Sequence, residues 1–272
     1  MKVLAKKELL RFLAEDLGKG DISSALLPRK KINAKIITRQ NALIAGVKYA
    51  KEIFELKGCK VRILKKDGSK VKRDQVILEI SGTPQGILSC ERTALNLLSR
   101  MSGIATKTNL LVKKIPNRKT KLYATRKTAP GLRFFDKEAV AIGGGKKHRM
   151  SLDQMVVLKD NHLAVGKSLE ELIKNAKRKH KKIEVEVDNQ KDAILAARAG
   201  VNIIMLDNFT PKNISKTISE LKKLGLRNKL KLEASGGINE RNISNFAKTG
   251  VDMISVGAIT NSVSGIDLSL EV

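Results

Sequence analysis

The sequence has little of what several protein classes require: it contains no tryptophan, only two cysteines and 3% aromatic residues. Scarce aromatic side chains leave few platforms on which nucleic-acid bases could stack. Cys59 and Cys90 are too few for a disulfide framework and lack the spacing of a metal site, which favours a reduced, cytoplasmic chain. Residues 253–266, the longest uncharged run near the C-terminus, are too few and too polar to span a bilayer, and residues 1–7 lack the apolar core of a signal peptide. We therefore expect no membrane partner.

Acidic residues are half as numerous as basic ones, 27 against 54, and the formal net charge is +27. Such a charge can indicate binding to nucleic acid or to a membrane surface. The lysines, however, are scattered along the chain in short pairs such as Lys6-Lys7 and Lys222-Lys223, and no single basic arm stands out. We interpret the excess as solvated lysine faces and expect no nucleic-acid partner, although the positive potential favours capture of an anionic substrate.

The first 115 residues show the short strands and helices of an α+β region. Leucines recur at three- and four-residue steps over residues 4–17, which predicts an amphipathic helix. A long helical stretch is predicted over residues 85–114, with Gly103 as a possible break. The other predicted elements are strand-like segments at 32–45, 61–64 and 76–80 and a helix at 47–56.

After residue 116, strand-like runs alternate with helix-like runs, which predicts a parallel sheet, either open or closed into a barrel. Three helices carry start signals: a capping box at Ser168 and Glu171, a proline after Thr210, and a capping asparagine at Asn239. The predicted strands cover residues 121–124, 155–158, 183–187, 203–206, 230–234 and 253–256.

Two of these strands alternate apolar and charged residues, which favours a barrel. In an open sheet covered by helices, both faces of a strand are expected to be apolar. Charged residues on one face instead indicate a lumen in which Glu184, Lys231 and Glu233 can pair. An exposed edge strand is the alternative, because edge strands also carry charge.

The ends of the predicted strands carry the residues of a candidate site, since α/β barrels place their active sites at the carboxyl ends. Ser235-Gly236-Gly237 precedes a predicted helix and offers backbone N–H groups to a phosphate, with plain turn chemistry as the alternative. Gly257-Ala258 follows the next strand and matches the phosphate-site pattern of such barrels. Glu186 and Asp207 could address ribose hydroxyls or a Mg²⁺ carrying phosphate, or could form ion pairs with Lys159 or Lys127.

Three cationic clusters lie within forty residues and predict a site for a carboxylated ligand. Arginine forks and lysine point charges both suit carboxylates. His148 could donate to an anion or be structural. No Ser-His-Asp or Cys-His nucleophile set stands out. Together, the predicted phosphate site and the cationic clusters indicate an enzyme that acts on one phosphorylated and one carboxylated ligand. The clusters contain Arg126, Lys127 and Arg133, then His148 and Arg149, then Lys159.

The run Thr125-Arg126-Lys127-Thr128-x-Pro-Gly-x-Arg133 resembles the quinolinate phosphoribosyltransferase family, also called nicotinate-nucleotide pyrophosphorylase (carboxylating). The resemblance covers essentially the whole chain and rests on an ordered, highly specific set of motifs. The set includes Glu15-Asp16-x-Gly-x-Gly-Asp21, Glu91-Arg92-Thr93-Ala94, Gly143-Gly144-Gly145-x-x-His148-Arg149, Lys159-Asp160-Asn161-His162, Glu184-Val185-Glu186-Val187, Leu206-Asp207-Asn208, Glu233-Ala234-Ser235-Gly236-Gly237 and Ser255-Val256-Gly257-Ala258.

The resemblance implies an N-terminal α/β sandwich over residues 1–115, with the tail 265–272 packing back on it, and an incomplete α/β (TIM-like) barrel over 116–264. It implies phosphoribosyl transfer from phosphoribosyl pyrophosphate to quinolinate with decarboxylation, giving nicotinate mononucleotide, pyrophosphate and CO₂ for NAD synthesis. It also implies a homodimer or hexamer whose site is completed by Arg92 of the neighbouring subunit.

By motif, the resemblance assigns the quinolinate carboxylates to five cationic residues, together with Arg92 of the neighbour: Arg126, Lys127, His148, Arg149 and Lys159. Thr125 belongs to the same substrate-binding set, and Glu186 and Asp207 are assigned to the ribose and to Mg²⁺-pyrophosphate. The 5′-phosphate falls to Ser235, Gly236, Gly237, Gly257 and Ala258. Lys127, Lys159, Glu186 and Asp207 form the expected catalytic set.

Two other functions fit parts of the pattern. A related phosphoribosyltransferase of the molybdenum-transport-associated type would act on another substrate, but the intact Lys159-Asp160-Asn161-His162 run argues against it. A basic nucleic-acid-binding protein on the same fold would show steeply salt-dependent DNA binding. One departure from the family concerns the phosphate side, where Asn261 stands in place of the usual histidine.

Overall fold

A computed structural model describes residues 2–165 and 168–272, and the chain forms two compact units. The first unit runs to Asn109 and includes Ala129–Gly144 and Ser262–Val272; the second comprises Leu110–Thr128 and Gly145–Asn261. The division expected at residues 115 and 116 stays a prediction, but Ala129–Gly144 packs with the first unit rather than with the barrel strands. No helix in the described ranges is long and apolar enough to cross a membrane.

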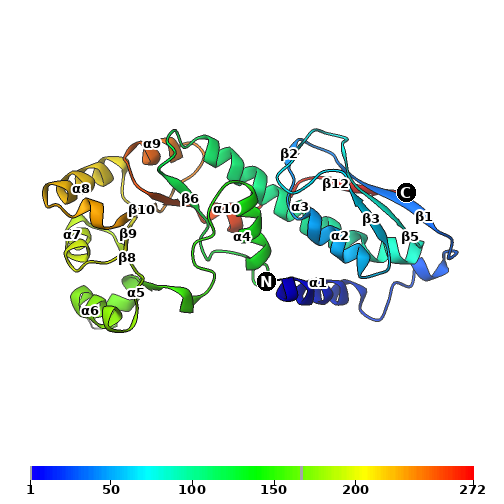
Figure 1. The fold of residues 1–272 in the computed structure, drawn as a ribbon, viewed down its shortest axis with the longest axis horizontal. Helices are drawn as coiled ribbons and strands as arrows, with labels where there is room; N and C mark the ends of the chain where they lie inside the picture. The colour runs from blue at the N-terminus through cyan, green and yellow to red at the C-terminus, as the bar shows by residue number, and fades with distance from the viewer. Residues whose placement is uncertain (1, 166–167) are drawn as a thin grey trace. The chain divides into compact units, whose positions relative to one another are not determined.

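The first unit is built on a four-stranded antiparallel sheet of order β12-β1-β5-β3. Helix α2 packs on β3 and β5 through its buried face, which includes Ile53 and Phe54 (Figure 1). Its strands are β1 (Ile32–Thr38), β3 (Lys60–Ile63), β5 (Val76–Gly82) and β12 (Leu268–Glu271), with a separate pair β2 (Ala42–Leu43) and β4 (Lys70–Val71). Its helices are α1 (Lys2–Leu17), α2 (Val47–Glu55), most of α3 (Pro84–Lys113), α4 (Arg133–Ile142) and the short η1 (Ser24–Leu26).

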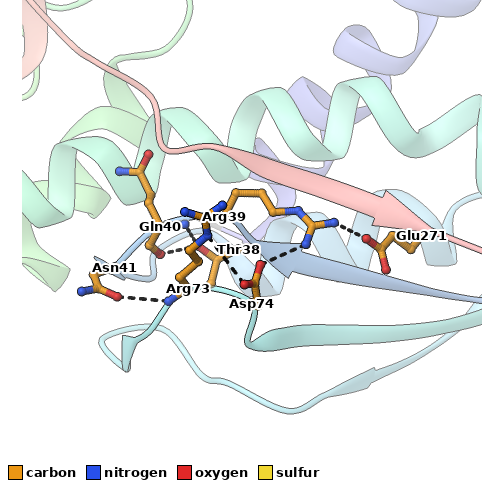
Figure 2. A network of polar contacts seen from close by, with 7 residues as sticks. All are labelled: Thr38, Arg39, Gln40, Asn41, Arg73, Asp74 and Glu271. Atoms are coloured by element: carbon orange, nitrogen blue, oxygen red, sulfur yellow. Dashed lines mark hydrogen bonds and ion pairs between the residues drawn. The ribbon is translucent and has the colours of Figure 1, made fainter.

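The last strand of the chain, β12, is held to β1 by backbone pairing and by one arginine. Thr38 of β1 lies opposite Leu268 of β12. Figure 2 shows the guanidinium of Arg39 between two carboxylates, those of Asp74 and Glu271, with Nη1 3.0 Å from Asp74 Oδ1. Because these groups are partly exposed, we assign most of the attachment to the strand pairing rather than to the ion pairs.

Helix α3 runs without interruption through Gly103, so the predicted break there is wrong. The glycine has a different role: a Cβ atom at this position would collide with the carbonyl oxygen of Ser264. The hydroxyl of Ser99, one turn earlier, donates to the carbonyl of Ile266. Gly103 therefore lets the returning C-terminal segment pass close to the helix.

The second unit contains a six-stranded parallel sheet of order β6-β11-β10-β9-β8-β7, whose two edges, β6 and β7, do not pair with each other. The predicted fold class, an incomplete barrel beside a smaller α/β region, is confirmed, and each strand lies within one residue of its predicted limits. Figure 1 shows α6, α7 and α8 on one side of the strands. The strands are β6 (Lys121–Tyr123), β7 (Val156–Leu158), β8 (Ile183–Val187), β9 (Ile203–Asp207), β10 (Lys231–Ser235) and β11 (Met253–Ser255). The helices are α5 (Asp160–Leu163), α6 (Leu169–Lys179), α7 (Gln190–Arg198), α8 (Pro211–Lys223), α9 (Ile243–Lys248) and α10 (Ala258–Asn261), with short η2 (Leu152–Gln154) and η3 (Arg227–Lys229).

Two of the three predicted helix starts are present. The Ser168 hydroxyl accepts a hydrogen bond from the Glu171 N–H at 3.3 Å, and the Thr210 hydroxyl accepts one from Asn213 ahead of Pro211. Asn239, in contrast, does not cap its helix, because α9 begins at Ile243 with Asn242 as the preceding residue. The side chain of Asn239 accepts instead from the N–H of Arg241 in the intervening turn.

Candidate active site

A cleft of about 670 Å³ lies at the carboxyl ends of the barrel strands. The parallel register places these ends side by side: Ser235 at the end of β10 is opposite Asp207 at the end of β9. All the predicted site residues of the second unit line this one cleft, while Arg92 lies on α3 in the first unit. The lining predicted residues are Thr125, Arg126, Lys127, His148, Arg149, Lys159, Glu186, Asp207, Ser235, Gly236, Gly237, Gly257 and Ala258.

The cationic side of the cleft contains two arginines that influence each other. Arg149 is anchored, because its Nη1 donates to the carbonyl of Met155 at 2.8 Å. Burial and the nearby charge of Arg126 both lower the pKa of the Arg149 guanidinium. Two like charges held close together favour an anion between them, since the anion removes their repulsion.

Lys127 is placed in the cleft by its own backbone. Its N–H donates to the Thr125 hydroxyl at 3.0 Å, and its carbonyl accepts from the Thr260 hydroxyl at 2.8 Å. A Cβ atom added to Gly257 would lie 3.0 Å from Cδ of Lys127, so a larger residue there would press on the lysine side chain. Gly257 therefore leaves room for Lys127 at the edge of β11.

The glycine loop after β10 is a turn, not the start of a helix. Gly236 and Gly237 have φ values of 89° and 61°, in the left-handed region that favours glycine. A helix does follow them, but the expectation that their N–H groups lie at its N-terminus is wrong, because α9 begins only at Ile243. Successive backbone N–H groups in such a turn can still form a concave anion site.

The two carboxylates at the ends of β8 and β9 already have polar partners. Glu186 forms an ion pair with Lys159, which is the structural alternative that the sequence left open. Asp207 accepts a hydrogen bond from the side-chain amide of Asn208 at 2.7 Å. Both acids face the cleft, so they remain placed to meet a ligand bound there.

The floor of the cleft contains a buried charged cluster formed by His148, Glu184 and Glu233. Nε2 of His148 lies 3.1 Å from a carboxylate oxygen of Glu184 and 3.4 Å from one of Glu233. Both glutamates are completely buried. The predicted pairing with Lys231 is wrong, because the Lys231 side chain is exposed and the histidine takes its place.

The protonation of His148 follows from its surroundings. Burial by itself would lower the pKa of the imidazole, but its contacts with Glu184 and Glu233 outweigh that effect and raise the pKa to about 9. Burial also raises the pKa of Glu184. His148, Glu184 and Glu233 are also the described residues whose ligating atoms, all within 4.8 Å of one another, could hold a metal ion. The N–O distances instead fit an imidazolium that offsets one of the two negative charges, in line with the raised pKa of Glu184.

Sequence reasoning found both glutamates but missed their partner. The alternation along β8 and β10 indicated that Glu184 and Glu233 face a lumen. For His148 the sequence left both a ligand contact and a structural role open, because it lies in a loop with φ of 51° and no periodic pattern shows where such a side chain points. Its motif partner Arg149 and the glycines before it gave no signal of this contact.

The fold and the cleft define an α/β-barrel enzyme with basic residues and a glycine loop at the carboxyl edge of its sheet. The chain belongs to the quinolinate phosphoribosyl transferase family. The model of the N-terminal domain of that family matches residues 21–102, and the model of its C-terminal domain matches residues 104–271.

Similar proteins span nearly the whole chain. A probable nicotinate-nucleotide pyrophosphorylase [carboxylating] of Archaeoglobus fulgidus is 45% identical over 255 residues, which cover 93% of this chain and 98% of the relative. The nicotinate-nucleotide pyrophosphorylase [carboxylating] of Dictyostelium discoideum is 35% identical and covers 100% of this chain and 96% of its own. The solved structure of the nicotinate-nucleotide pyrophosphorylase from Francisella tularensis superimposes with a TM-score of 0.92 at 38% identity, covering 100% of this chain and 96% of that one.

Proposed function

We propose that this protein transfers the phosphoribosyl group of phosphoribosyl pyrophosphate to quinolinate and releases CO₂. The products are nicotinate mononucleotide and pyrophosphate, in the synthesis of NAD. The observation that carries the proposal is one cleft that joins a set of cations to a glycine loop and two strand-end acids. Family membership over both domains supports the same reaction.

The cationic side of the cleft suits quinolinate, which carries two carboxylates on one ring. Arg126, Lys127 and Arg149, with His148 and Lys159, supply charge and hydrogen-bond donors for both groups. Neutralising the carboxylates lets the pyridine nitrogen approach the ribose carbon of an anionic co-substrate. Holding the two reactants in contact removes much of the entropic barrier to their reaction.

The opposite side of the cleft suits phosphoribosyl pyrophosphate. Ser235, Gly236, Gly237, Gly257 and Ala258 would receive the 5′-phosphate through backbone N–H groups and a hydroxyl. Glu186 and Asp207 would hold the ribose hydroxyls and the Mg²⁺ that accompanies the pyrophosphate, since carboxylate oxygens suit that ion. Bound Mg²⁺ supplies charge neutralisation for the departing pyrophosphate.

The residues of the cleft would act on charges that appear during the reaction. The bond from the pyridine nitrogen to the ribose carbon forms as the bond from that carbon to pyrophosphate breaks. Glu186 and Asp207 stabilise the positive charge that develops at the ribose carbon. The ring nitrogen is then quaternised, and the bond between a ring carbon and its carboxylate breaks to release CO₂. The ring accepts the electron pair of that bond, and the ring carbon then takes up a proton.

A second copy of the chain would complete the site with Arg92, in a homodimer or hexamer. The side chain of Arg92 is 66% exposed on α3, and its contact with Glu91 is long, at 3.8 Å. A guanidinium in that state is available to another subunit without first breaking a strong ion pair.

The decisive experiment is a turnover assay with quinolinate, phosphoribosyl pyrophosphate and Mg²⁺, following nicotinate mononucleotide and CO₂. Nicotinate serves as the control substrate, because it lacks the carboxylate that is released. We expect product from quinolinate and none from nicotinate. A folded protein that gives no product from quinolinate would contradict the proposal.

A further inference from the structure

The floor of the cleft presents an electrostatic puzzle. A pocket proposed to bind a dianion is expected to repel buried acids, yet Glu184 and Glu233 are completely buried beneath it. None of their four carboxylate oxygens has a hydrogen-bond partner of good geometry among the described residues. Uncompensated buried carboxylates are strongly destabilising, and such a group is relieved either by taking up a proton or by a nearby cation.

His148 is the group placed to supply that cation. Its side chain is 10% exposed, and its Nε2 faces one oxygen of each acid, at 3.1 Å and 3.4 Å. The acids reach it from β8 and β10, the two strands that flank β9. The ring of Tyr123 on β6 packs edge-on against the imidazole at 6.0 Å. The imidazole is thus fixed from three strands of the sheet.

The backbone of His148 indicates that this placement is imposed by its surroundings. Its φ of 51° lies in the left-handed region, which costs a residue with a side chain about 1 kcal/mol or more. Such a conformation persists where packing and charge around the residue determine it. Arg149 is the next residue, so the same strained turn also determines where the side chain of Arg149 starts.

We propose that Glu184 and Glu233 are positioning residues that hold His148 as a fixed cation on the floor of the cleft. Because Nε2 faces the two buried acids, the other ring nitrogen, Nδ1, is the N–H donor left for a carboxylate of the substrate. The acids therefore act on quinolinate through His148 and do not touch it. This inference rests on the proposed function for the identity of the ligand, but not for the state of the imidazole.

A first experiment tests the imidazole without any substrate. The chain has only three histidines, so NMR of the ¹⁵N-labelled protein can follow each ring, and His148→Gln identifies the relevant signals. The charged groups that face this ring are Glu184 and Glu233, while Arg149 acts on Glu184 and the Tyr123 ring on β6 packs against the imidazole. We expect the His148 ring to remain doubly protonated up to pH 8. A ring that is neutral at pH 7 in the wild-type protein would overturn the proposal.

A second experiment measures quinolinate binding by calorimetry at pH 6.0 and pH 8.5 in Glu184→Gln and Glu233→Gln. Each substitution keeps the shape of the side chain and removes its charge. We expect the Kd to rise about tenfold at pH 8.5 and to return toward the wild-type value at pH 6.0, where the histidine regains its proton. A purely structural role would weaken binding equally at both pH values and would overturn the proposal.

Two controls separate the possible failures. Glu220→Gln removes a partly exposed acid on α8 that pairs with Lys223, and it should leave the Kd unchanged at both pH values. In a His148→Gln background, Glu233→Gln should cause no further loss, because the acid acts through the histidine; an additive loss would count against the proposal. If the wild-type protein does not bind quinolinate, the proposed function fails, while the NMR titration still decides the state of His148.

Discussion

Gly236 packs so closely against Asn208 that a Cβ atom at position 236 would lie 2.7 Å from the Asn208 backbone nitrogen. That nitrogen donates to the carbonyl of Ser235 at 2.9 Å, and Asn208 itself has a φ of 56°. The loops after β9 and β10 are therefore locked together at the edge of the cleft. Asp207 and the glycine turn, which we assign to opposite parts of phosphoribosyl pyrophosphate, are held in one rigid unit.

Gly236→Ala should weaken binding of phosphoribosyl pyrophosphate and destabilise the protein by about 1–3 kcal/mol, because both the collision and the positive φ oppose the side chain. The KM for phosphoribosyl pyrophosphate should rise at least tenfold. Gly225→Ala is the matched control, since Gly225 has a φ of 67° but open space around it. It should lose stability without a change in KM, and equal KM values for the two variants would refute the assignment.

Glu186→Gln should lower kcat by about a hundredfold, because it removes a carboxylate that faces the developing charge at the ribose carbon. Lys159→Met breaks the same ion pair from the other side and should mainly raise the KM for quinolinate. The two single variants and the double variant form a cycle of steady-state measurements. If the two single variants and the double variant all change the same kinetic parameter by the same factor, the ion pair is structural and neither residue has a separate role.

Stability of the wild-type protein should fall as pH rises from about 7 to about 9.5. His148 has a pKa raised from 6.5 to about 9, so the folded state keeps a proton that the unfolded chain has lost in this interval. The stabilisation is complete below about pH 6.5, is lost through pH 9, and amounts to at most roughly 3 kcal/mol. Urea unfolding across this range measures it. The comparison is His148→Arg, because the charge of arginine does not titrate in this range. If the wild type and this variant lose stability with pH in the same way, the raised pKa of His148 is contradicted.

The strands and the edge of the sheet that carries the site could be predicted because both follow from local patterns. Ile183, Val185 and Val187 alternate with acids, and parallel strands place their carboxyl ends together whatever the loops do. Glu186 and Asp207 were found in this way, from the positions where two strands end. Such reasoning places a residue at an edge, but it does not say which neighbour the side chain meets.

The features that the sequence could not show depend on contacts between distant segments. Gly103 resembles a helix break, but the returning chain at Ser264 is what requires a glycine there. Asn239 has the chemistry of a cap, but Asn242 lies nearer the helix and takes that position. By alternation Lys231 belongs to the same face of its strand as Glu233, but it is the first residue of β10 and its side chain is exposed to solvent. In each case the deciding partner is set by tertiary packing, which no local period records.

Mixing two inactive variants should restore activity if the site is shared between subunits. Arg92→Ala and Arg126→Ala should each fold normally and lose turnover, because each removes a proposed guanidinium contact with quinolinate. Arg118→Ala, an exposed arginine on the same unit as Arg126, should be nearly silent and serves as control. In a mixed dimer one of the two sites has both arginines, so refolding an equal mixture should recover roughly a quarter of wild-type activity. No recovery, with mixed dimers verified by mass spectrometry, would mean that Arg92 does not complete the neighbour's site. An Arg126→Ala protein that keeps near-normal turnover would instead remove Arg126 from the carboxylate site.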